Sequence, residues 1–323
     1  MQAILLALRP RTSESLEWTD THPALRPVLD RPLVHHVMEW LVDRGATDVV
    51  AVSDVEPARL TDAIGDGSRW GCRVVHVAVE DEAGAVTALR QTAEASTDPL
   101  IAVAAADCLP LRGGNTLTTW ELVVVEGDGG AGSAAWSRWA VVPPQDLARA
   151  ARVSSMAMLG DELVAMAGTR GTRTPSEGWL DARCASDLLA SNQRALESRQ
   201  QGLLPSGREI EPGIWVGRNV RLGSGVRLVA PAFIGENTSV SAGCTVGPHA
   251  SIGSSCLIDA NAVLTRSMVT AGTYVGEGLD VLDAIVDGNV LVNVRLGASV
   301  RVDDGLLLAG GRRAAQERRT ASR

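Results

Sequence analysis

Asp107 is the residue best placed for chemistry, because it directly follows the apolar run IAVAAA at residues 101–106. A continuous apolar run is typical of a buried strand in a parallel sheet, and ligands of such sheets bind beyond the carboxyl ends of their strands. A polar segment, residues 10–21, follows a second apolar run, AILLAL at residues 3–8. We expect a ligand site at these two strand ends. The alternative for Asp107 is a carboxylate that only caps its strand.

Other reactive side chains offer less. All 30 basic residues are arginine, so this chain has no lysine chemistry. The cysteines show neither C-x-x-C nor Cys/His spacing, and we predict that they are reduced and mostly buried. They are Cys72, Cys108, Cys184, Cys244 and Cys256. Four histidines also lack metal-ligand spacing: His22, His35, His36 and His76.

The elements that position Asp107 alternate between strand and helix patterns. Strands are predicted at residues 3–8, 48–53, 73–79 and 100–105, and helices at residues 33–44, 57–64 and 84–95. This alternation predicts a Rossmann-like α/β domain with a parallel sheet. Beyond it the pattern is weaker. We predict strands at 122–126 and 139–142, and helices at 144–152 and 182–200.

The second half contains a hexapeptide repeat. Large aliphatic residues recur at every sixth position: Val216, Leu222, Leu228, Ile234, Val240, Val246, Ile252, Ile258 and Leu264. Glycine follows most of them, and we expect these glycines at corners with φ > 0. A six-residue period predicts a left-handed β-helix in which three repeats make one triangular coil. The phase slips after Leu264 and recovers at Val290, Leu296, Val302 and Leu308. Residues 213–309 are therefore predicted to form about five coils with one irregular turn or small loop near residues 265–272.

These patterns give a domain plan: an α/β domain at residues 1–200, a linker at 201–212, a β-helix at 213–309 and a mobile arginine-rich tail at 310–323. The formal net charge of −8 argues against a nucleic-acid partner. No apolar run reaches the length of a membrane span, and the first residues lack a signal-peptide pattern, so we expect a cytoplasmic protein. A solenoid with open ends favours self-association.

Two stretches resemble a known family. The segment TDTHPALRPVLDRPLVHHVMEWL resembles TDTxPKxLxPVxxxPLxxHxxxxL, and GDGSRWGCRVVHVAVEDEAGAVTAL resembles GDGSxxGxxIxYxxExxxxGTAGAL. Together with EGWLDARCASDLLASN, GTYVGEGLDVLDAIVDGN and the hexapeptides, they are similar to sugar-1-phosphate nucleotidyltransferases, also called NDP-sugar pyrophosphorylases. Within that family the chain looks most like mannose-1-phosphate guanylyltransferase. GDGSRWG and YVGEG are the most specific of these matches, and together the matches touch most of the chain.

The resemblance implies a reaction that joins a nucleoside triphosphate to a sugar 1-phosphate and releases pyrophosphate. Charge neutralisation and alignment at the α-phosphorus drive it, because the attacking phosphate oxygen is already ionised. By resemblance, Asp107 and Asp181 match the two aspartates that hold Mg²⁺, and Gly84 matches the glycine near the nucleobase. The alternative for Asp181 is a cap at the N-terminus of the helix that follows it.

Other parts of the family pattern are missing. Gly45 is the first glycine of the chain, so no glycine-rich loop can cradle a triphosphate after the first strand. The lysine of the family's PK motif is absent, and the glutamate–lysine pair for the sugar phosphate has no match in a shortened substrate half. Arg9, Arg11 or Arg26 could supply positive charge, although a guanidinium does not reproduce the position of an ammonium.

Three functions remain open. We favour a non-catalytic relative that acts as a regulatory or assembly partner, associating with itself or with an active homologue and compatible with a nucleotide or nucleotide-sugar ligand. The first alternative is an active nucleotidyltransferase that makes an NDP-sugar such as GDP-mannose with Mg²⁺. The second is acyl transfer on the β-helix with His249 as general base, although its place in the repeat predicts an outward, surface histidine.

Overall fold

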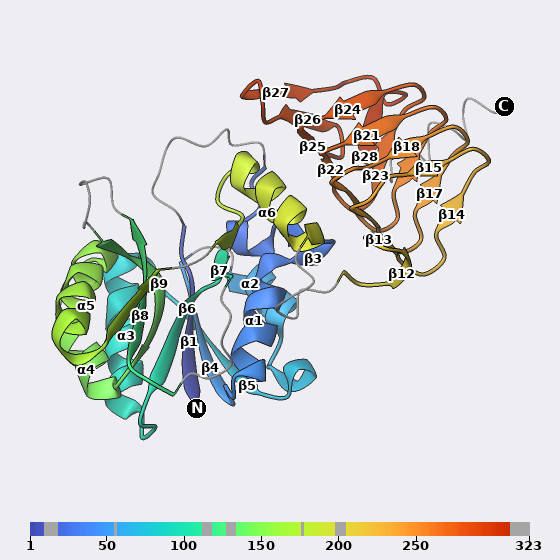
Figure 1. Ribbon diagram of the computed structural model, residues 1–323. Helices are drawn as coiled ribbons and strands as arrows, with labels where there is room; N and C mark the ends of the chain where they lie inside the picture. The colour runs from blue at the N-terminus through green and yellow to red at the C-terminus, as the bar shows by residue number, and fades with distance from the viewer. Residues whose placement is uncertain are drawn as a thin grey trace. The chain divides into compact units, whose positions relative to one another are not determined.

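The computed structural model describes residues 1–9, 19–54, 57–111, 118–126, 134–175, 178–197 and 205–310 (Figure 1). The chain divides into two compact units. The α/β unit comprises Met1–Arg11, Thr21–Leu25 and Pro32–Trp179, and the β-helix unit comprises Thr12–Asp20, Arg26–Arg31 and Leu180–Arg323. The division therefore falls at Leu180, twenty residues before the predicted end of the first domain at residue 200. The arginine-rich tail beyond residue 310 lies outside the described residues.

A seven-stranded sheet forms the centre of the α/β unit, in the order β10-β8-β9-β6-β1-β4-β5. Its strands are β1 (Gln2–Ala7), β4 (Asp48–Ser53), β5 (Arg73–Ala78), β6 (Ile101–Ala105), β8 (Glu121–Glu126), β9 (Ala134–Val142) and β10 (Thr172–Pro175). The four strands predicted from apolar runs pair in parallel, β6 with β1, β1 with β4 and β4 with β5. Strand β9 runs antiparallel to both β6 and β8. The predicted Rossmann-like sheet is confirmed.

Helices cover both faces of this sheet (Figure 1). They are α1 (Leu33–Asp43), α2 (Pro57–Ile64), α3 (Glu82–Ala95), α4 (Pro144–Ala150) and α5 (Met156–Arg170). Buried Leu89 of α3, Leu147 of α4 and Leu159 of α5 join Ile4 and Ile101 of the sheet in one hydrophobic cluster. This burial holds three helices on the same face. Helix α5 was not predicted. Three short elements also belong to the α/β unit: η1 (Pro23–Leu25), η2 (Ser68–Trp70) and β7 (Cys108–Pro110). Strand β2 (Pro27–Val28) belongs to the β-helix unit, and β3 (Arg31–Pro32) and β11 (Trp179–Asp181) are divided between the two.

The β-helix unit consists of short parallel strands on three faces. From β13 to β22, each strand pairs in parallel with the strand three elements later, as in β13 with β16 and β16 with β19. The strands are β13 (Ile214–Val216), β14 (Arg221–Leu222), β15 (Arg227–Leu228), β16 (Ala232–Ile234), β17 (Ser239–Val240), β18 (Thr245–Val246), β19 (Ala250–Ile252), β20 (Leu257–Ile258), β21 (Val263–Thr265), β22 (Met268–Val269), β23 (Thr273–Val275) and β24 (Asp280–Leu282). The aliphatic repeat lies inside, with Ile252, Ile258 and Leu264 fully buried. The predicted left-handed parallel β-helix is confirmed as the fold class.

Helix α6 (Ala185–Glu197) belongs to the same unit, because it packs on the solenoid. The Asn192 side-chain amide lies 3.2 Å from the Met268 sulfur. Phe233 and Met268 are neighbours of inward aliphatic residues in their strands, so the alternation of side chains directs them out of the coil. They are nevertheless at most 2% exposed, and so is Ile285. A face of the solenoid that would otherwise be solvated is therefore buried within the unit. This contact is consistent with the assignment of α6 to the β-helix unit.

The repeat glycines are required for a different reason from the one predicted. Of Gly217, Gly223, Gly235, Gly247 and Gly253, only Gly247 has φ > 0. A Cβ on Gly217 would lie 2.5 Å from the Glu236 nitrogen in the next coil, and a Cβ on Gly223 would lie 2.6 Å from the Ala242 nitrogen. Contacts below 3.0 Å do not occur for real Cβ atoms. Close stacking of backbone on backbone, and not a left-handed conformation, selects glycine here.

The prediction for the end of the solenoid was partly wrong. At the phase slip the strand pairing continues with one residue fewer, since Ile252 pairs with Val269 and Ile258 with Val275. No inserted loop is needed. The expected fifth coil is replaced by an antiparallel cap of β25 (Ala284–Asp287), β26 (Val290–Asn293), β27 (Ala298–Arg301) and β28 (Leu308–Gly310). Leu296, assigned to the interior from its spacing, is 72% exposed.

Two further predictions can be compared with the structure. All five cysteines are free, with Cys108, Cys244 and Cys256 buried and Cys72 and Cys184 half-buried. Burial raises the pKa of the Cys256 thiol to about 12, so this sulfur is unreactive. Among the described helices, none has both the length and the apolar character needed to cross a membrane.

Candidate functional site

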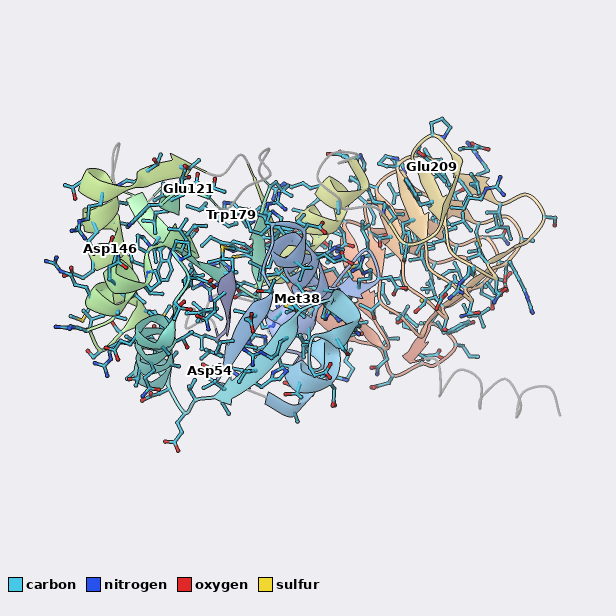
Figure 2. The ribbon with its side chains drawn as sticks, turned by 90° about the horizontal axis from the view of Figure 1, so that it is seen from below. Met38, Asp54, Glu121, Asp146, Trp179 and Glu209 are labelled. Carbon is cyan, nitrogen blue, oxygen red and sulfur yellow. The ribbon has the colours of Figure 1, made fainter. Side chains whose placement is uncertain are left out.

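The carboxyl end of β1 is the first predicted part of the site. The backbone N–H of Arg9 donates to both carboxylate oxygens of Asp54, at 3.0 and 3.2 Å. Asp54 follows β4, which pairs with β1 up to Ala7 and Ser53; Figure 2 labels it. A carboxylate therefore already holds a backbone N–H just beyond the end of β1. Residues 10–18, which include Arg11, lie outside the described residues.

Gly84 lies in the first turn of α3, where its N–H contacts a second carboxylate, that of Asp81. Asp81 occupies the N-cap position, and its Oδ1 accepts a hydrogen bond of 2.8 Å from the Gly84 N–H. An acidic N-cap satisfies one of the unpaired N–H groups and complements the positive end of the helix dipole. A Cβ on Gly84 would lie 3.2 Å from the Val79 Cβ, which is tight contact. The Gly84 N–H is thus engaged within the chain.

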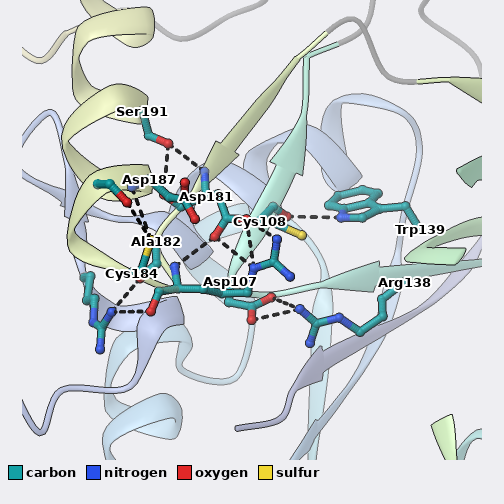
Figure 3. A network of polar contacts seen from close by, with 12 residues as sticks. Asp107, Cys108, Arg138, Trp139, Asp181, Ala182, Cys184, Asp187 and Ser191 are labelled. Atoms are coloured by element: carbon teal, nitrogen blue, oxygen red, sulfur yellow. Dashed lines mark hydrogen bonds and ion pairs between the residues drawn. The ribbon is translucent and has the colours of Figure 1, made fainter. Parts of the chain in front are cut away.

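Asp107 lies beyond β6, as predicted, and is fully buried. Both of its carboxylate oxygens accept from one terminal nitrogen of Arg138, at 2.8 and 2.9 Å (Figure 3). The Arg138 side chain is 19% exposed. A buried carboxylate requires a partner of opposite charge, and here the guanidinium supplies it. No local pattern in the sequence indicates this partner, which lies 31 residues further along the chain.

A bulge in β9 directs Arg138 toward Asp107. Trp136 pairs with Val124 of β8 and Trp139 pairs with Val123, so Ser137 and Arg138 are unpaired in the register. Arg138 has φ 68°, which is uncommon for a residue with a side chain. Bulges of this kind re-aim side chains next to functional sites.

Two tryptophans fix this bulge. The Trp136 indole N–H donates to the Trp139 carbonyl at 3.0 Å, and the Trp139 indole N–H donates to the Cys108 carbonyl at 3.1 Å. The second bond ties the bulge to β7, directly after Asp107 (Figure 3). The Arg138 backbone is therefore held in place from both sides.

Asp181 lies at the end of β11 and is 7% exposed. Its Oδ1 accepts from the Arg183 backbone N–H at 2.8 Å, and the Arg183 guanidinium donates to both carboxylate oxygens. The cap position of α6 is instead Cys184, whose sulfur lies 3.4 Å from the Asp187 nitrogen. The carboxylate thus forms a turn and an ion pair two residues along the chain. Asp107 and Asp181 fall in different units, and each is paired with an arginine.

Arg26 is a buried residue, 8% exposed, whose guanidinium donates to two backbone carbonyls. The acceptors are Ala182 at 2.7 Å and Arg183 at 2.9 Å. Carbonyls after a strand need donors when they are buried. Arg26 therefore fixes the segment that follows Asp181.

His249 is half-buried beside α6. Its Nδ1 lies 3.5 Å from Oε1 of Glu197, an ion-pair distance without hydrogen-bond geometry, and its side chain is 28% exposed. The predicted surface position is therefore confirmed only in part, because the side chain is partly covered and its Nδ1 is buried.

Comparison with known proteins adds little at the level of sequence. No protein-family profile and no curated protein matches this chain. Among solved structures, a protein designated glucose-1-phosphate thymidylyltransferase from Bacillus anthracis, in complex with sucrose, is similar with a TM-score of 0.48 and 13% identity. That match covers 62% of this chain and 98% of the other.

Proposed function

We propose that this chain is a sugar-1-phosphate nucleotidyltransferase-like protein that does not catalyse the family reaction. It serves instead as a regulatory or assembly partner in nucleotide-sugar metabolism, the supply of polysaccharide precursors. The observation that carries the proposal is the contact between the Arg9 N–H and the Asp54 carboxylate. Like charges repel most strongly at close range, so a carboxylate at this point disfavours a triphosphate.

Three further features support the same conclusion. The chain has no lysine and no glycine before Gly45, so neither the ammonium nor the bare backbone of the family is present. The Gly84 N–H is held by Asp81. Arg26, a candidate for phosphate binding, directs its guanidinium at backbone carbonyls. Each feature removes a group that would neutralise phosphate charge.

A partner role is supported by exposed aliphatic residues near the end of the β-helix. Five large hydrophobic side chains between residues 282 and 307 are at least 42% exposed: Leu282, Leu296, Val300, Leu306 and Leu307. Apolar groups gathered at one end of a domain are typical of an association surface. The partner we propose is a second copy of this chain or an active homologue.

The catalytic part of the proposal is tested with purified protein, Mg²⁺, a panel of nucleoside triphosphates and a panel of sugar 1-phosphates. We expect pyrophosphate release no greater than that of an Asp107→Asn variant. Release by the wild type that the variant lacks would refute the proposal. A calorimetric titration with the same nucleotides then separates a ligand sensor, which gives heat, from an assembly partner, which gives none.

The association part is tested by sedimentation of the chain alone and mixed with an active homologue. We expect complexes that a Leu296→Ser/Leu306→Ser double variant weakens while its melting temperature stays close to that of the wild type. The partner role would be contradicted if the chain were monomeric alone and formed no complex with the active homologue.

A second candidate is an active nucleotidyltransferase. It is favoured by the position of Asp107, directly beyond β6, since ligands of α/β sheets bind at the carboxyl ends of the strands. In that case arginines would neutralise the phosphate charge, and the pyrophosphate assay would give a positive result.

A further inference from the structure

The Asp107–Arg138 pair is a built site and not a chance surface contact. The carboxylate is fully buried, and both oxygens face one guanidinium nitrogen at 2.8 and 2.9 Å. An ionised carboxylate in such a place is costly unless a cation neutralises it. Arg138 provides that cation from within the chain.

The bulge shows that Arg138 is pre-positioned. Its φ of 68° is a conformation that is unfavourable for a residue with a side chain unless the surroundings enforce it. Here Ser137 donates to the Val123 carbonyl at 2.7 Å, and the indole of Trp139 holds the Cys108 carbonyl. The guanidinium therefore reaches Asp107 without ordering a flexible segment.

The residues around Asp107 do not fit a resident Mg²⁺. Magnesium requires oxygen ligands at about 2.0–2.1 Å in octahedral geometry, usually from one or two carboxylates. Both oxygens of Asp107 already face a guanidinium. Within the described part of the chain, no group of three or more His, Cys, Asp or Glu side chains could hold a metal ion. A magnesium ion and the Arg138 guanidinium would compete for the same two oxygens.

We infer that Arg138 takes the place of the divalent cation at Asp107, so that the arginine and a metal ion exclude each other. The inference deepens the proposed function and rests on it for the role of Asp107 in the family. It predicts that the wild type binds no divalent cation at this carboxylate. It also predicts that removing the guanidinium creates a site for one.

The experiment measures Mn²⁺ binding by electron paramagnetic resonance and by thermal unfolding with and without the ion. Arg138→Ala should bind Mn²⁺ at least about tenfold more tightly than the wild type, and Mn²⁺ should raise its melting temperature. Adding Asp107→Asn to Arg138→Ala should abolish both effects. Arg138→Gln, which keeps the shape of the side chain but no charge, should bind like Arg138→Ala and serves if the alanine variant does not fold.

Arg170→Ala is the matched control. Arg170 pairs with Asp146, another buried carboxylate of the α/β unit, and the Trp120 indole N–H donates to the same carboxylate at 3.1 Å (Asp146 is labelled in Figure 2). The resemblance assigns no metal to Asp146, so this variant should lose stability without gaining Mn²⁺ binding. An equal response of Arg170→Ala and Arg138→Ala would show a general effect of unpaired carboxylates and would overturn the inference.

Two other results would also overturn it: Mn²⁺ binding by the wild type that Asp107→Asn abolishes, or no binding by either folded Arg138 variant. Neither result decides whether the protein is catalytic, because no substrate is present. Pyrophosphate release by the wild type would instead refute the proposed function. Pyrophosphate release that continues after divalent cations are removed would refute the proposed function alone, because it would still be compatible with Arg138 in place of the cation.

Discussion

Asp30 lies close to Ser254, and both the backbone N–H and the hydroxyl group of Ser254 lower the pKa of its carboxyl. Its carboxylate lies against two stacked glycines: a Cβ on Gly235 would come within 2.8 Å of one oxygen, and a Cβ on Gly253 within 2.9 Å of the other. Burial raises the pKa of the Asp30 carboxyl in spite of the opposing effect of Ser254, and the negative charge of Glu236 acts in the same direction as burial. All these residues belong to the β-helix unit.

Asp30→Asn is expected to stabilise the protein more at pH 7 than at acidic pH. A raised pKa means that the folded protein binds the proton more tightly than the unfolded chain does. This contribution is complete below the unfolded pKa of about 3.9 and is lost as the pH rises through the folded pKa. The amide cannot ionise, so the free energies of unfolding of variant and wild type should converge on acidification. Chemical denaturation at several pH values measures this.

Asp283→Asn is the control with the opposite sign. The Arg266 guanidinium donates to both Asp283 oxygens, at 2.7 and 3.0 Å, and these hydrogen bonds lower the pKa of the Asp283 carboxyl. Its contribution is present above the unfolded pKa and is lost as the pH falls through the folded pKa. We therefore expect Asp283→Asn to be less stable than the wild type at pH 7. If Asp30→Asn were also less stable than the wild type at pH 7, the assignment of the Asp30 pKa would be wrong.

Gly223→Ala tests the close stacking of the coils. The new methyl group would meet the Ala242 nitrogen at 2.6 Å and the Ser241 carbonyl carbon at 2.7 Å, which are backbone atoms that cannot move aside without shifting a coil. We expect a loss of about 2 kcal/mol or more in the free energy of unfolding. Gly310→Ala is the control, since nothing lies within 4 Å of its Cβ position and its φ is not positive. Equal effects in denaturant titrations would argue against the stacking explanation.

Ile252→Ala and Leu296→Ala test which residues of the six-residue repeat lie inside the solenoid and which lie in the exposed cap. Ile252 is fully buried in the solenoid, so its truncation should cost about 2–5 kcal/mol. Leu296 is 72% exposed, and its truncation should change stability by no more than about 0.5 kcal/mol. Thermal or chemical unfolding of both variants decides the point. A large loss for Leu296→Ala would restore the fifth coil that the hexapeptide spacing predicted.

Trp139→Phe tests the anchor of the β9 bulge. The ring is 2% exposed, and its N–H is the donor to the Cys108 carbonyl. Phenylalanine fills most of the space but leaves that carbonyl without this donor, at a cost of about 1–3 kcal/mol. The measurement is the free energy of unfolding from denaturant titration. An unchanged value would mean that the indole hydrogen bond does not hold the bulge.

The sequence predicted the elements whose signals are local. The apolar runs of β1, β4 and β6 and the six-residue period of the solenoid depend only on burial, which repeats at a fixed spacing. Helix α5 was missed because Gly160 lies within it, and glycine weakens helix formation by about 1 kcal/mol. The structure explains that glycine, since a Cβ at this position would lie 3.3 Å from the Trp136 Cβ. A tertiary contact therefore favours glycine at this position, and that glycine weakens the sequence signal of the helix.

The candidate site was predicted in position but not in its contacts. Asp107 lies at the expected strand end, yet its partner depends on a bulge that no local pattern announces. The Asp54–Arg9 contact could have been found, because each residue closely follows one of two neighbouring parallel strands and like ends of such strands lie side by side. Charges beyond adjacent strand ends are therefore worth comparing in any α/β sequence.

The antiparallel cap also determines how long the solenoid can become. Parallel stacking requires every new strand to run in the same direction as the one beneath it, whereas β26 and β28 run opposite to the strands they cover. Duplicating a full coil of three hexapeptides upstream of the cap would lengthen the solenoid, but repeats placed beyond the cap would find no edge of matching polarity on those two faces. Growth by repeat duplication is thus confined to the interior of the array.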